Sequence, residues 1–507
     1  MTSLPETTSA NANIPIKRSP PTGITVLIVG AGVAGLMSAL ECWREGHEVL
    51  GVFERSADVL LSGDIFGIGP SVTRNFRHWP YLATSLQTVQ YDAWLAYYSY
   101  SGTHIFGPNP HEFNKPGAFD DSDDDKLKKG PYTAFLQSRP KFYLMLLHQV
   151  QELGIPITFN RSVEDYYEDV TRGVGGIVFA DGEKMEADVV LAADGVGSKA
   201  WKIVGGGEKV KATSCGYAIY RTAYPVKLAL EDPLVRERWG GGLRGSEGEG
   251  GRPIFEFWVG PDLHVVVVLT HDLASWSLTH KDDGTAKESW AGLTSPDTVL
   301  SLLTSHTATT GALWHPALKA LINTTPPSSI IDWKLLWRDP QPEWTSPGGH
   351  VLQVGDSAHS FLPTSGNGAT QAMEDAISIA ACLQIGGRSN VAWATRVHNK
   401  LRFHRVSLAQ KQGIINLAAA HHTEWNTIDT DPSAVAAKLG SWIWKHDPEG
   451  YAYEKYGLAF RSLVDGDEEF ENTNVPKGCV YEPWTVGELL RAMERGEKLL
   501  LGGGDWS

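Results

Sequence analysis

Cysteine is scarce in this chain of 507 residues, which contains only Cys42, Cys215, Cys382 and Cys479. These four stand too far apart for metal-ligand pairs, and so few thiols are not typical of a disulfide scaffold. The HExxH, CxxC and GxSxG patterns are also missing. These absences argue against metal-dependent hydrolysis and against a serine nucleophile, and we expect no bound metal.

Positive charge is in short supply as well. Lys and Arg total 44 against 59 Asp and Glu, a net charge of −15, which argues against nucleic-acid or anionic-membrane partners. Apolar runs such as residues 263–270 have the length of a strand, far below the ~20 residues that cross a bilayer. Residues 1–23 show no apolar signal-peptide stretch. We expect a cytoplasmic monomer or homodimer with no membrane span.

The chain does have enough apolar residues for a large core. They make up 42% of it, and the 18 tryptophans suggest aromatic-lined cavities. Residues 24–30 have the continuous β-branched pattern of a buried parallel strand, residues 32–46 that of a helix, and residues 48–54 that of a second strand. Together they predict a βαβ unit.

A GxGxxG pattern occupies the turn of this unit. Gly30 permits a tight turn, Gly32 lets the backbone approach a pyrophosphate, and Gly35 allows the helix to pack closely on the strand. The helix N-terminus then directs free N–H groups at the phosphates. Glu54 ends the next strand, where a carboxylate accepts from ribose hydroxyls. The pattern predicts FAD or NAD(H) rather than NADP at this turn.

Later segments extend the pattern. We expect helices over residues 139–153, 369–384 and 392–420, and strands over residues 177–182, 188–192, 216–226, 254–259 and 263–270. The consecutive strands indicate an antiparallel second sheet. Residues 101–130, with their acidic cluster, read as an exposed loop, and the glycine-rich residues 240–251 as a flexible hairpin tip.

A second motif carries a family resemblance. Gly355-Asp356-Ser357-Ala358-His359 is followed by Pro363, by Gly366-Asn367-Gly368 and by Glu374-Asp375-Ala376. This run resembles the single-component FAD-dependent aromatic hydroxylases of the p-hydroxybenzoate and salicylate hydroxylase type, and residues 63–74 resemble their fungal secondary-metabolism branch. Residues 194–198 match the family's DGxxS motif, although Trp201 stands where the family usually has arginine.

The resemblance implies an α/β, p-hydroxybenzoate hydroxylase-like fold. Its Rossmann-like FAD-binding domain would comprise residues 23–205 and 331–410, and the inserted antiparallel-sheet substrate domain residues 206–330. Residues 1–22 would form a disordered tail, and residues 411–507 a helical, Trp-rich extension.

FAD is thus the expected cofactor, held at both ends. Asp356, at a strand end, is a suitable acceptor for a ribityl hydroxyl, and glycines 366 and 368 let backbone N–H groups approach the flavin beside Ala369. Family matching adds Gly67, Arg139 and Asp194 near the cofactor. The full expected set is Gly30, Gly32, Gly35, Glu54, Gly67, Arg139, Asp194, Asp356, Gly366, Gly368 and Ala369.

The implied activity is a monooxygenase that uses NADPH or NADH as a transient co-substrate. Reduced flavin and O2 would form a C4a-hydroperoxide that hydroxylates an aromatic or polycyclic, indole- or phenol-type small molecule. Arg221 is the candidate catalytic residue, with a structural salt bridge as the alternative. Tyr220 and Phe257 are candidate substrate contacts, although strand alternation lets only about half of such residues face one cavity.

Other activities compete with hydroxylation. Epoxidation or Baeyer–Villiger insertion is the nearest alternative, followed by a non-oxygenating flavin dehydrogenase or reductase. Trp442-Ile443-Trp444 matches half of the halogenase WxWxIP motif, but Lys445-His446-Asp447 follows instead of Ile-Pro. A FAD-binding protein without catalysis is the remaining possibility.

Overall fold

The fold is described from a computed structural model. It describes residues 15–59, 64–119, 134–208, 211–244, 251–289, 292–421, 431–436, 439–466, 470–495, 497, 499 and 501–507.

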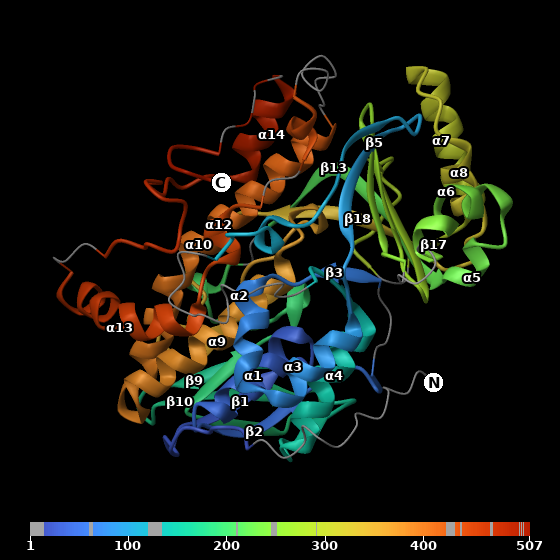
Figure 1. Ribbon diagram of the computed structural model, residues 1–507. Coiled ribbons are helices and arrows are strands. Elements are labelled where there is room, and N and C mark those ends of the chain that lie inside the picture. Colours follow the sequence, from blue (N-terminus) through green and yellow to red (C-terminus); the bar gives the residue numbers. More distant parts are fainter. Residues whose placement is uncertain are drawn as a thin grey trace.

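The described chain forms two layer systems, each a large sheet together with the elements that cover it. The first is built on a five-stranded parallel sheet in the order β19-β12-β1-β2-β8. Its strands are β1 (Thr25–Val29), β2 (Glu48–Phe53), β8 (Ile157–Thr158), β12 (Val189–Ala192) and β19 (Val351–Gln353). Helices α1 (Val33–Arg44), α4 (Arg139–Glu152) and α9 (Gly368–Gly386) cover one face (Figure 1). An antiparallel sheet of β9 (Val163–Asp169), β10 (Val174–Phe179) and β11 (Lys184–Ala187) covers the other.

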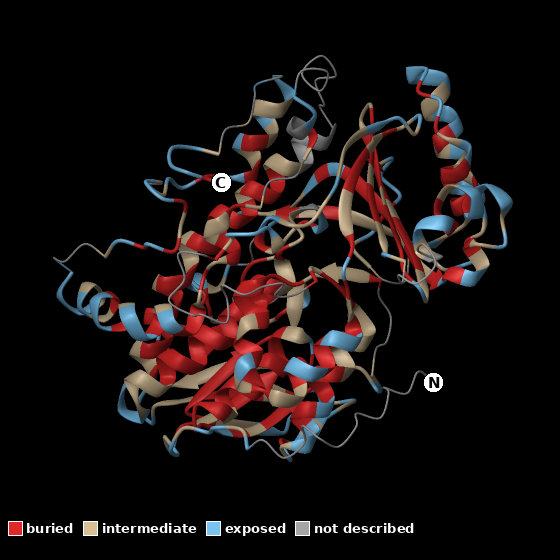
Figure 2. Ribbon diagram, viewed as in Figure 1, coloured by how far each residue is buried: buried red, intermediate tan, exposed pale blue. Residues whose placement is uncertain are grey.

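Alternation along β1 explains this sandwich. Val26 and Ile28 pack into the core under the helices, whereas Leu27 and Val29 pack against β9 and β10. Both faces of the strand are therefore buried, as its unbroken β-branched run predicts. Figure 2 shows the resulting continuous region of buried residues around α1, α9 and the sheet.

An eight-stranded sheet forms the second layer system, in the order β17-β18-β13-β16-β15-β14-β5-β6. Its strands are β5 (Trp94–Ser99), β6 (His104–Asn109), β13 (Ala212–Pro225), β14 (Ile254–Gly260), β15 (Leu263–Leu269), β16 (Leu273–Lys281), β17 (Leu293–Thr294) and β18 (Ile330–Arg338). Neighbours are antiparallel except β14 and β5, which are parallel. Helices α6 (Pro233–Arg244), α7 (Pro296–Thr310) and α8 (Pro316–Asn323) cover its outer face (Figure 1).

The remaining elements are shorter or connect the two systems. The strands β3 (Ile65–Gly67), β7 (Leu136–Ser138) and β4 (Gln90–Tyr91) form a small sheet. The other helices are α2 (Pro70–Thr73), α3 (Pro80–Val89), α5 (Val226–Ala229), α10 (Val391–His421), α12 (Ser441–Trp444), α13 (Pro448–Asp465) and α14 (Val486–Glu494). Short 3-10 turns include η1 (Arg74–His78), η2 (Glu112–Asn114), η4 (Gly195–Gly197), η5 (Ala200–Lys202), η6 (Gly205–Gly207), η7 (Gly355–Ser357), η8 (Pro363–Ser365), η9 (Arg388–Asn390) and η10 (Pro432–Val435).

A buried ion network explains the Glu-Asp-Ala run on α9. Arg402 of α10 donates to Glu374 at 2.5 Å and to Asp375 at 2.9 Å. Asp375 also accepts the Gly355 N–H at 3.0 Å, so the helix holds the turn that precedes Asp356. Arg405 bonds to Glu374 and to backbone carbonyls at residues 442, 443 and 474. The C-terminal segment is therefore docked onto α9 and α10, beside which it lies in Figure 1.

Four expectations about organisation need correction. Residues 15–22 are not a disordered tail, because Ser19 and Thr22 donate backbone hydrogen bonds to carbonyls at the end of α1. Strand β6 lies inside the expected loop 101–130, whose acidic cluster 120–125 falls outside the described residues. The large sheet is not confined to residues 206–330, since it takes β5 and β6 from earlier in the chain. Glycines 240–242 lie in α6 rather than in a hairpin tip; residues 245–250 are outside the described part.

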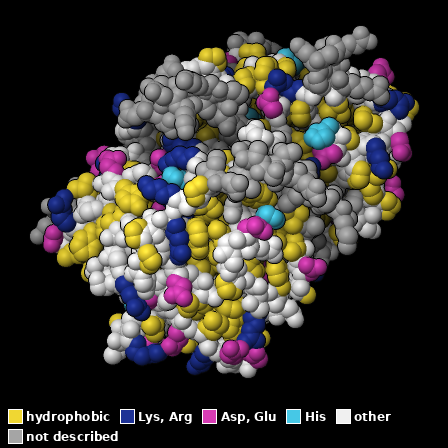
Figure 3. All heavy atoms as spheres, turned by 60° about the horizontal axis from the view of Figure 1, so that its bottom comes forward, with side chains coloured by type: hydrophobic (Ala, Val, Ile, Leu, Met, Phe, Trp, Pro, Cys, Tyr) yellow, Lys and Arg dark blue, Asp and Glu magenta, His cyan; other side chains and the backbone are white. Residues whose placement is uncertain are grey.

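The surface carries charges of both signs. Lys, Arg, Asp and Glu side chains are interspersed with apolar ones on the face drawn in Figure 3. Within the described residues, every helix is too short or too polar to cross a membrane.

Candidate active site

One cavity of about 630 Å³ connects the parallel-sheet layer with the large sheet. Its lining includes the N-termini of α1 and α9, the end of β2 and the inner face of β13–β16. Asn416 and Leu439, from the C-terminal part of the chain, also contribute to the wall. The two sequence motifs, more than three hundred residues apart, thus meet at one site.

The turn before α1 has the geometry of a phosphate-binding loop. Gly30 adopts φ +98°, and a Cβ there would lie 2.4 Å from a carbonyl oxygen. A Cβ on Gly35 would lie 1.9 Å from the Gly30 oxygen, whereas one on Gly32 would meet nothing within 4 Å and face open space. Glu54 accepts the N–H groups of Ala31 at 3.0 Å and Ser56 at 2.8 Å. Its carboxylate is thereby fixed at the cavity wall.

The opposite end of the cradle is built by the turn that leads into α9. Gly366 adopts φ +58°, which lets the chain reverse between η8 and α9. Asn367 is buried against the cavity, and its Nδ2 has no hydrogen-bond partner among the described residues. Gly368 and Ala369 form the first turn of α9 and line the same space. The helix dipole therefore adds positive potential there.

Asp356 faces the cavity from η7. Its side chain is accessible, yet burial among surrounding atoms raises its pKa, with the charges of His359 and Arg139 opposing that rise. The space in front of it includes the cavity. A carboxylate in that position has open lone pairs for a ligand hydroxyl.

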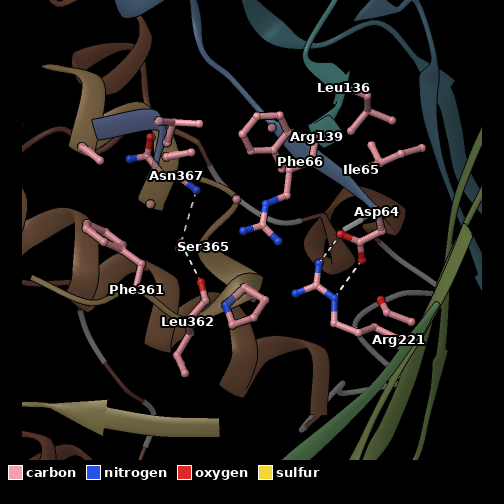
Figure 4. Close-up of a pocket in the computed structure, with 18 of the residues that line it drawn as sticks. Asp64, Ile65, Phe66, Leu136, Arg139, Arg221, Phe361, Leu362, Ser365 and Asn367 are labelled. Atoms are coloured by element: carbon pink, nitrogen blue, oxygen red, sulfur yellow. Dashed lines mark hydrogen bonds and ion pairs between the residues drawn. The ribbon is translucent and has the colours of Figure 1, made fainter. Parts of the chain in front are cut away.

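A carboxylate between two arginines occupies the junction of the two halves (Figure 4). Arg221 of β13 makes a two-pronged ion pair with Asp64, its Nε donating at 2.8 Å. The Arg139 backbone N–H donates to the Asp64 carbonyl at 3.0 Å. Burial lowers the pKa of the Arg139 guanidinium, and the charge of Asp64 opposes that shift. Arg221 is thus both a salt-bridge partner and a cavity residue.

Strand alternation decides which predicted substrate contacts reach the cavity. The inner face of the sheet presents every second residue to it, namely Leu95, Tyr97, Ile219, Arg221, Phe255, Phe257, His264, Val266, Val268, Ser275, Ser277 and Thr279. Phe257 is therefore placed as expected. Tyr220 is not, because it points to the outer face, where it stacks on His280 at 4.2 Å and packs in the core under α6–α8.

Two imidazoles also line this wall. Burial lowers the pKa of both His111 and His264 to about 4, so both are neutral at pH 7. His264 stacks beside Phe257, with centroids 6.2 Å apart. The sequence suggested only packing for His264 and nothing for His111, which lies in a segment without a regular pattern.

Two other residues predicted to bind the cofactor, Asp194 and Gly67, contribute no side chain to the cavity lining. Asp194 accepts from the Tyr166 hydroxyl at 2.7 Å, while its neighbours Ala193 and Gly195 line the cavity. Burial raises the pKa of the Asp194 carboxyl. Gly67 lines the cavity beneath the Phe135 ring, which a Cβ would approach within 2.2 Å.

Besides His111, the sequence pattern gave no role to two further cavity residues. Asp64 was part of the family match but carried no assigned role, since its partner Arg221 is 157 positions away. Asn367 lies between Gly366 and Gly368, which were predicted to bind the cofactor. Only the packing shows that its Nδ2 atom is buried with no hydrogen-bond partner among the described residues.

Comparison with known proteins decides the family. No protein-family model matches the chain. It is 44% identical to the FAD-dependent monooxygenase mdpD of Emericella nidulans, over 99% of this chain and 93% of that protein. It is also 44% identical to the FAD-dependent monooxygenase dmxR9 of a Cryptosporiopsis species, over 97% of this chain and 91% of that one. The chain belongs to the FAD-dependent monooxygenases.

A solved structure supports the same fold for this monooxygenase. CtdE, in complex with FAD and a substrate, is 28% identical and superposes with a TM-score of 0.75, covering 87% of this chain and 100% of CtdE. The Rossmann-like, p-hydroxybenzoate hydroxylase-like fold expected from the motifs is therefore confirmed, and so is FAD as the cofactor.

The residues present fit FAD. The open space at Gly32 suits a pyrophosphate, and the Asp356 carboxylate faces the same cavity. Asn367 offers an unpaired buried amide at the α9 end. These three features lie at different points of one extended cradle, and each can contact a different part of FAD.

Proposed function

We propose that this FAD-dependent monooxygenase takes electrons from NADPH or NADH and uses O2 to hydroxylate an aromatic or polycyclic small molecule. The observation that carries the proposal is the continuity of the cavity from the cofactor cradle onto the Phe255–Phe257 face of the large sheet. Bound FAD supplies the redox and oxygen chemistry. The chain must bind, orient and enclose the acceptor.

The cofactor-binding residues proposed are those that line the cradle. The Gly30–Gly35 turn and the α1 N-terminus hold the pyrophosphate, and Glu54 accepts from the adenosine ribose. Asp356 accepts from the ribityl chain, and the first turn of α9 directs N–H groups toward the flavin ring. Arg139 lies between these ends, where a guanidinium balances the cofactor's phosphate charge. Asp194 contributes indirectly, by fixing the backbone of the DGxxS turn against Tyr166.

Phe255 and Phe257 give the substrate an aromatic surface, with ring centroids 5.8 Å apart. Arg221 lies on the same inner face of the sheet, with strands β16 and β15 between it and Phe257, and Asp64 neutralises its charge. A guanidinium that is already paired with a carboxylate still has N–H groups to donate, but its charge is no longer available to neutralise a second carboxylate. It therefore suits a neutral oxygen better than an anionic one. We therefore assign Arg221 to hold a hydroxyl or carbonyl oxygen of a neutral substrate.

Oxygen transfer is tested with purified FAD-loaded enzyme and a panel of hydroxylated aromatic compounds. We expect some of them to stimulate NADPH or NADH oxidation, with a product 16 mass units heavier whose added oxygen derives from labelled O2. Flavin reduction with no labelled product for any compound that is turned over would instead indicate a dehydrogenase or reductase.

A further inference from the structure

His111 is a buried imidazole that the proposed cofactor site does not use. It lines the cavity, just before η2 and on the same side as Phe135. Its ring stacks on Phe113 at a centroid distance of 5.3 Å and an angle of 7°, and approaches Phe135 at 4.7 Å. These contacts hold the ring in one orientation.

The Nε2 atom of this ring is buried without a hydrogen-bond partner among the described residues. An unpaired polar atom in an apolar setting costs free energy that a hydrogen bond from a ligand would recover. The ring also stands beside Phe255, with centroids 6.1 Å apart, and so adjoins the aromatic surface proposed for the substrate. A ring bound on that surface can therefore present a substituent to His111.

The charge state of His111 limits which substituents of a substrate it can bind. Burial lowers the pKa of His111 to about 4, so the neutral ring does not compensate an anion and does not readily take a proton at pH 7. A neutral imidazole has one donor nitrogen and one acceptor nitrogen, and a hydroxyl group, which both donates and accepts, can satisfy Nε2 in either tautomer.

We propose that His111 binds a phenolic hydroxyl of the substrate and selects for hydroxylated over unsubstituted rings. This inference rests on the proposed function for the nature of the ligand. It adds a second polar contact to the one proposed for Arg221, at the Phe255 end of the aromatic surface. The substrate would then be an arene that already carries a hydroxyl group before this enzyme acts, so a ring-hydroxylating or ring-forming reaction must supply it.

The test compares two probes, 2-naphthol and naphthalene, titrated into FAD-loaded enzyme and followed by the change in flavin absorbance. We expect the preference for 2-naphthol to fall about fivefold in His111→Phe, the change expected for losing one hydrogen bond. His111→Gln keeps a polar group and should retain part of the preference. If His111→Phe fails to fold, His111→Gln still tests the proposal.

His280→Phe is the matched control. His280 is also a buried imidazole with an unpartnered Nε2, and it stacks on Tyr220, but on the outer face of the same sheet. Its replacement should leave the ratio of the two dissociation constants unchanged. An unchanged ratio in His111→Phe, an equal fall in His280→Phe, or no preference for 2-naphthol in the wild type overturns the proposal.

Failure of the proposed function would appear differently. It would show as no NADPH- or NADH-dependent bleaching of the flavin in the wild type. The ratio of the two dissociation constants would still decide the role of His111, since it needs no turnover.

Discussion

Asp356 is the single side chain on which the ribityl end of the proposed cofactor site depends. Its carboxylate faces the cavity, and burial raises its pKa. The carboxylate can therefore accept a hydrogen bond from a ribityl hydroxyl in the cavity. We expect Asp356→Ala to weaken FAD binding about tenfold or more, since a hydrogen bond to a charged group contributes about 1.5–3 kcal/mol. Flavin absorbance after gel filtration and an equilibrium titration of apoprotein measure this.

Asp92→Ala is the control for that variant, because Asp92 is exposed and pairs with Arg252 on the surface. It should keep its flavin. Full flavin content and affinity in Asp356→Ala would show that the ribityl chain is held by other groups.

Tyr220 and Phe257 test the alternation of the large sheet. Phe257 lines the cavity, whereas Tyr220 lies in the core on the outer face. We expect Phe257→Ala to raise the KM for the aromatic substrate roughly tenfold or more, because burying a phenylalanine ring contributes about 1.5–3 kcal/mol. Tyr220→Phe should leave KM unchanged within a factor of two. Steady-state kinetics on the substrate found by screening would measure both, and a larger effect at Tyr220 would contradict the register.

At the scale of elements, Gly32 and Gly35 of the GxGxxG pattern have different roles, Gly32 in cofactor binding and Gly35 in folding. A Cβ on Gly32 meets open space, so Gly32→Ala should keep the melting temperature of the apoprotein while weakening FAD binding about tenfold. A Cβ on Gly35 would clash with the Gly30 oxygen, so Gly35→Ala should destabilise the fold by more than about 2 kcal/mol, in the range of overpacking. Thermal unfolding with and without added FAD distinguishes the two. Equal effects on both quantities in both variants would contradict the separation.

How far the elements could be predicted depended on how local their signals are. β1, α1 and β2 follow from periodicity and the glycine turn, and the observed bounds differ from the expected ones by at most two residues at each end. Glycines 240–242 were wrongly expected in a hairpin tip. Each glycine costs about 1 kcal/mol in a helix, but α6 is stabilised by burying Val235 and Trp239 against the sheet, which no local pattern reveals.

Site residues divide in the same way. The Gly30–Gly35 turn and the Asp356 turn carry their chemistry in short motifs and were predicted. The Asp64–Arg221 pair and His111 were not, because the pair joins residues 157 positions apart and the setting of His111 depends on rings from three segments. Tyr220 was wrong because strand composition identifies a strand but not which of its faces meets the cavity.

At the scale of the whole molecule, the cavity exists because two layer systems and the C-terminal segment enclose it. α9 connects these parts: its N-terminus faces the cavity, its acidic residues bind Arg402 and Arg405, and Arg405 holds the C-terminal backbone. Asn416 and Leu439 then extend the wall. The C-terminal segment is therefore part of the site's enclosure, which helps to exclude water as oxygen transfer requires.

Buried histidines in both layer systems make the stability of the molecule sensitive to mild acid. Burial lowers the pKa of His47, His111 and His264 to about 4 and that of His398 to about 3. The unfolded chain binds protons at these positions below about pH 6.5, and the native chain does not. The free energy of unfolding should therefore fall as the pH drops from about 6.5 toward 4, by roughly 1.4 kcal/mol per pH unit for each group.

Urea unfolding at fixed FAD concentration between pH 7.5 and 4.5 measures this slope. His398→Asn removes one group, so its slope should be shallower by roughly 1.4 kcal/mol per pH unit, whatever the variant's stability at pH 7.5. His271→Asn changes an exposed ring, 75% accessible, and should reproduce the wild-type slope. A free energy of unfolding that stays constant from pH 6.5 to 5 would mean that these imidazoles take up protons in the native state, and that the core around them admits water.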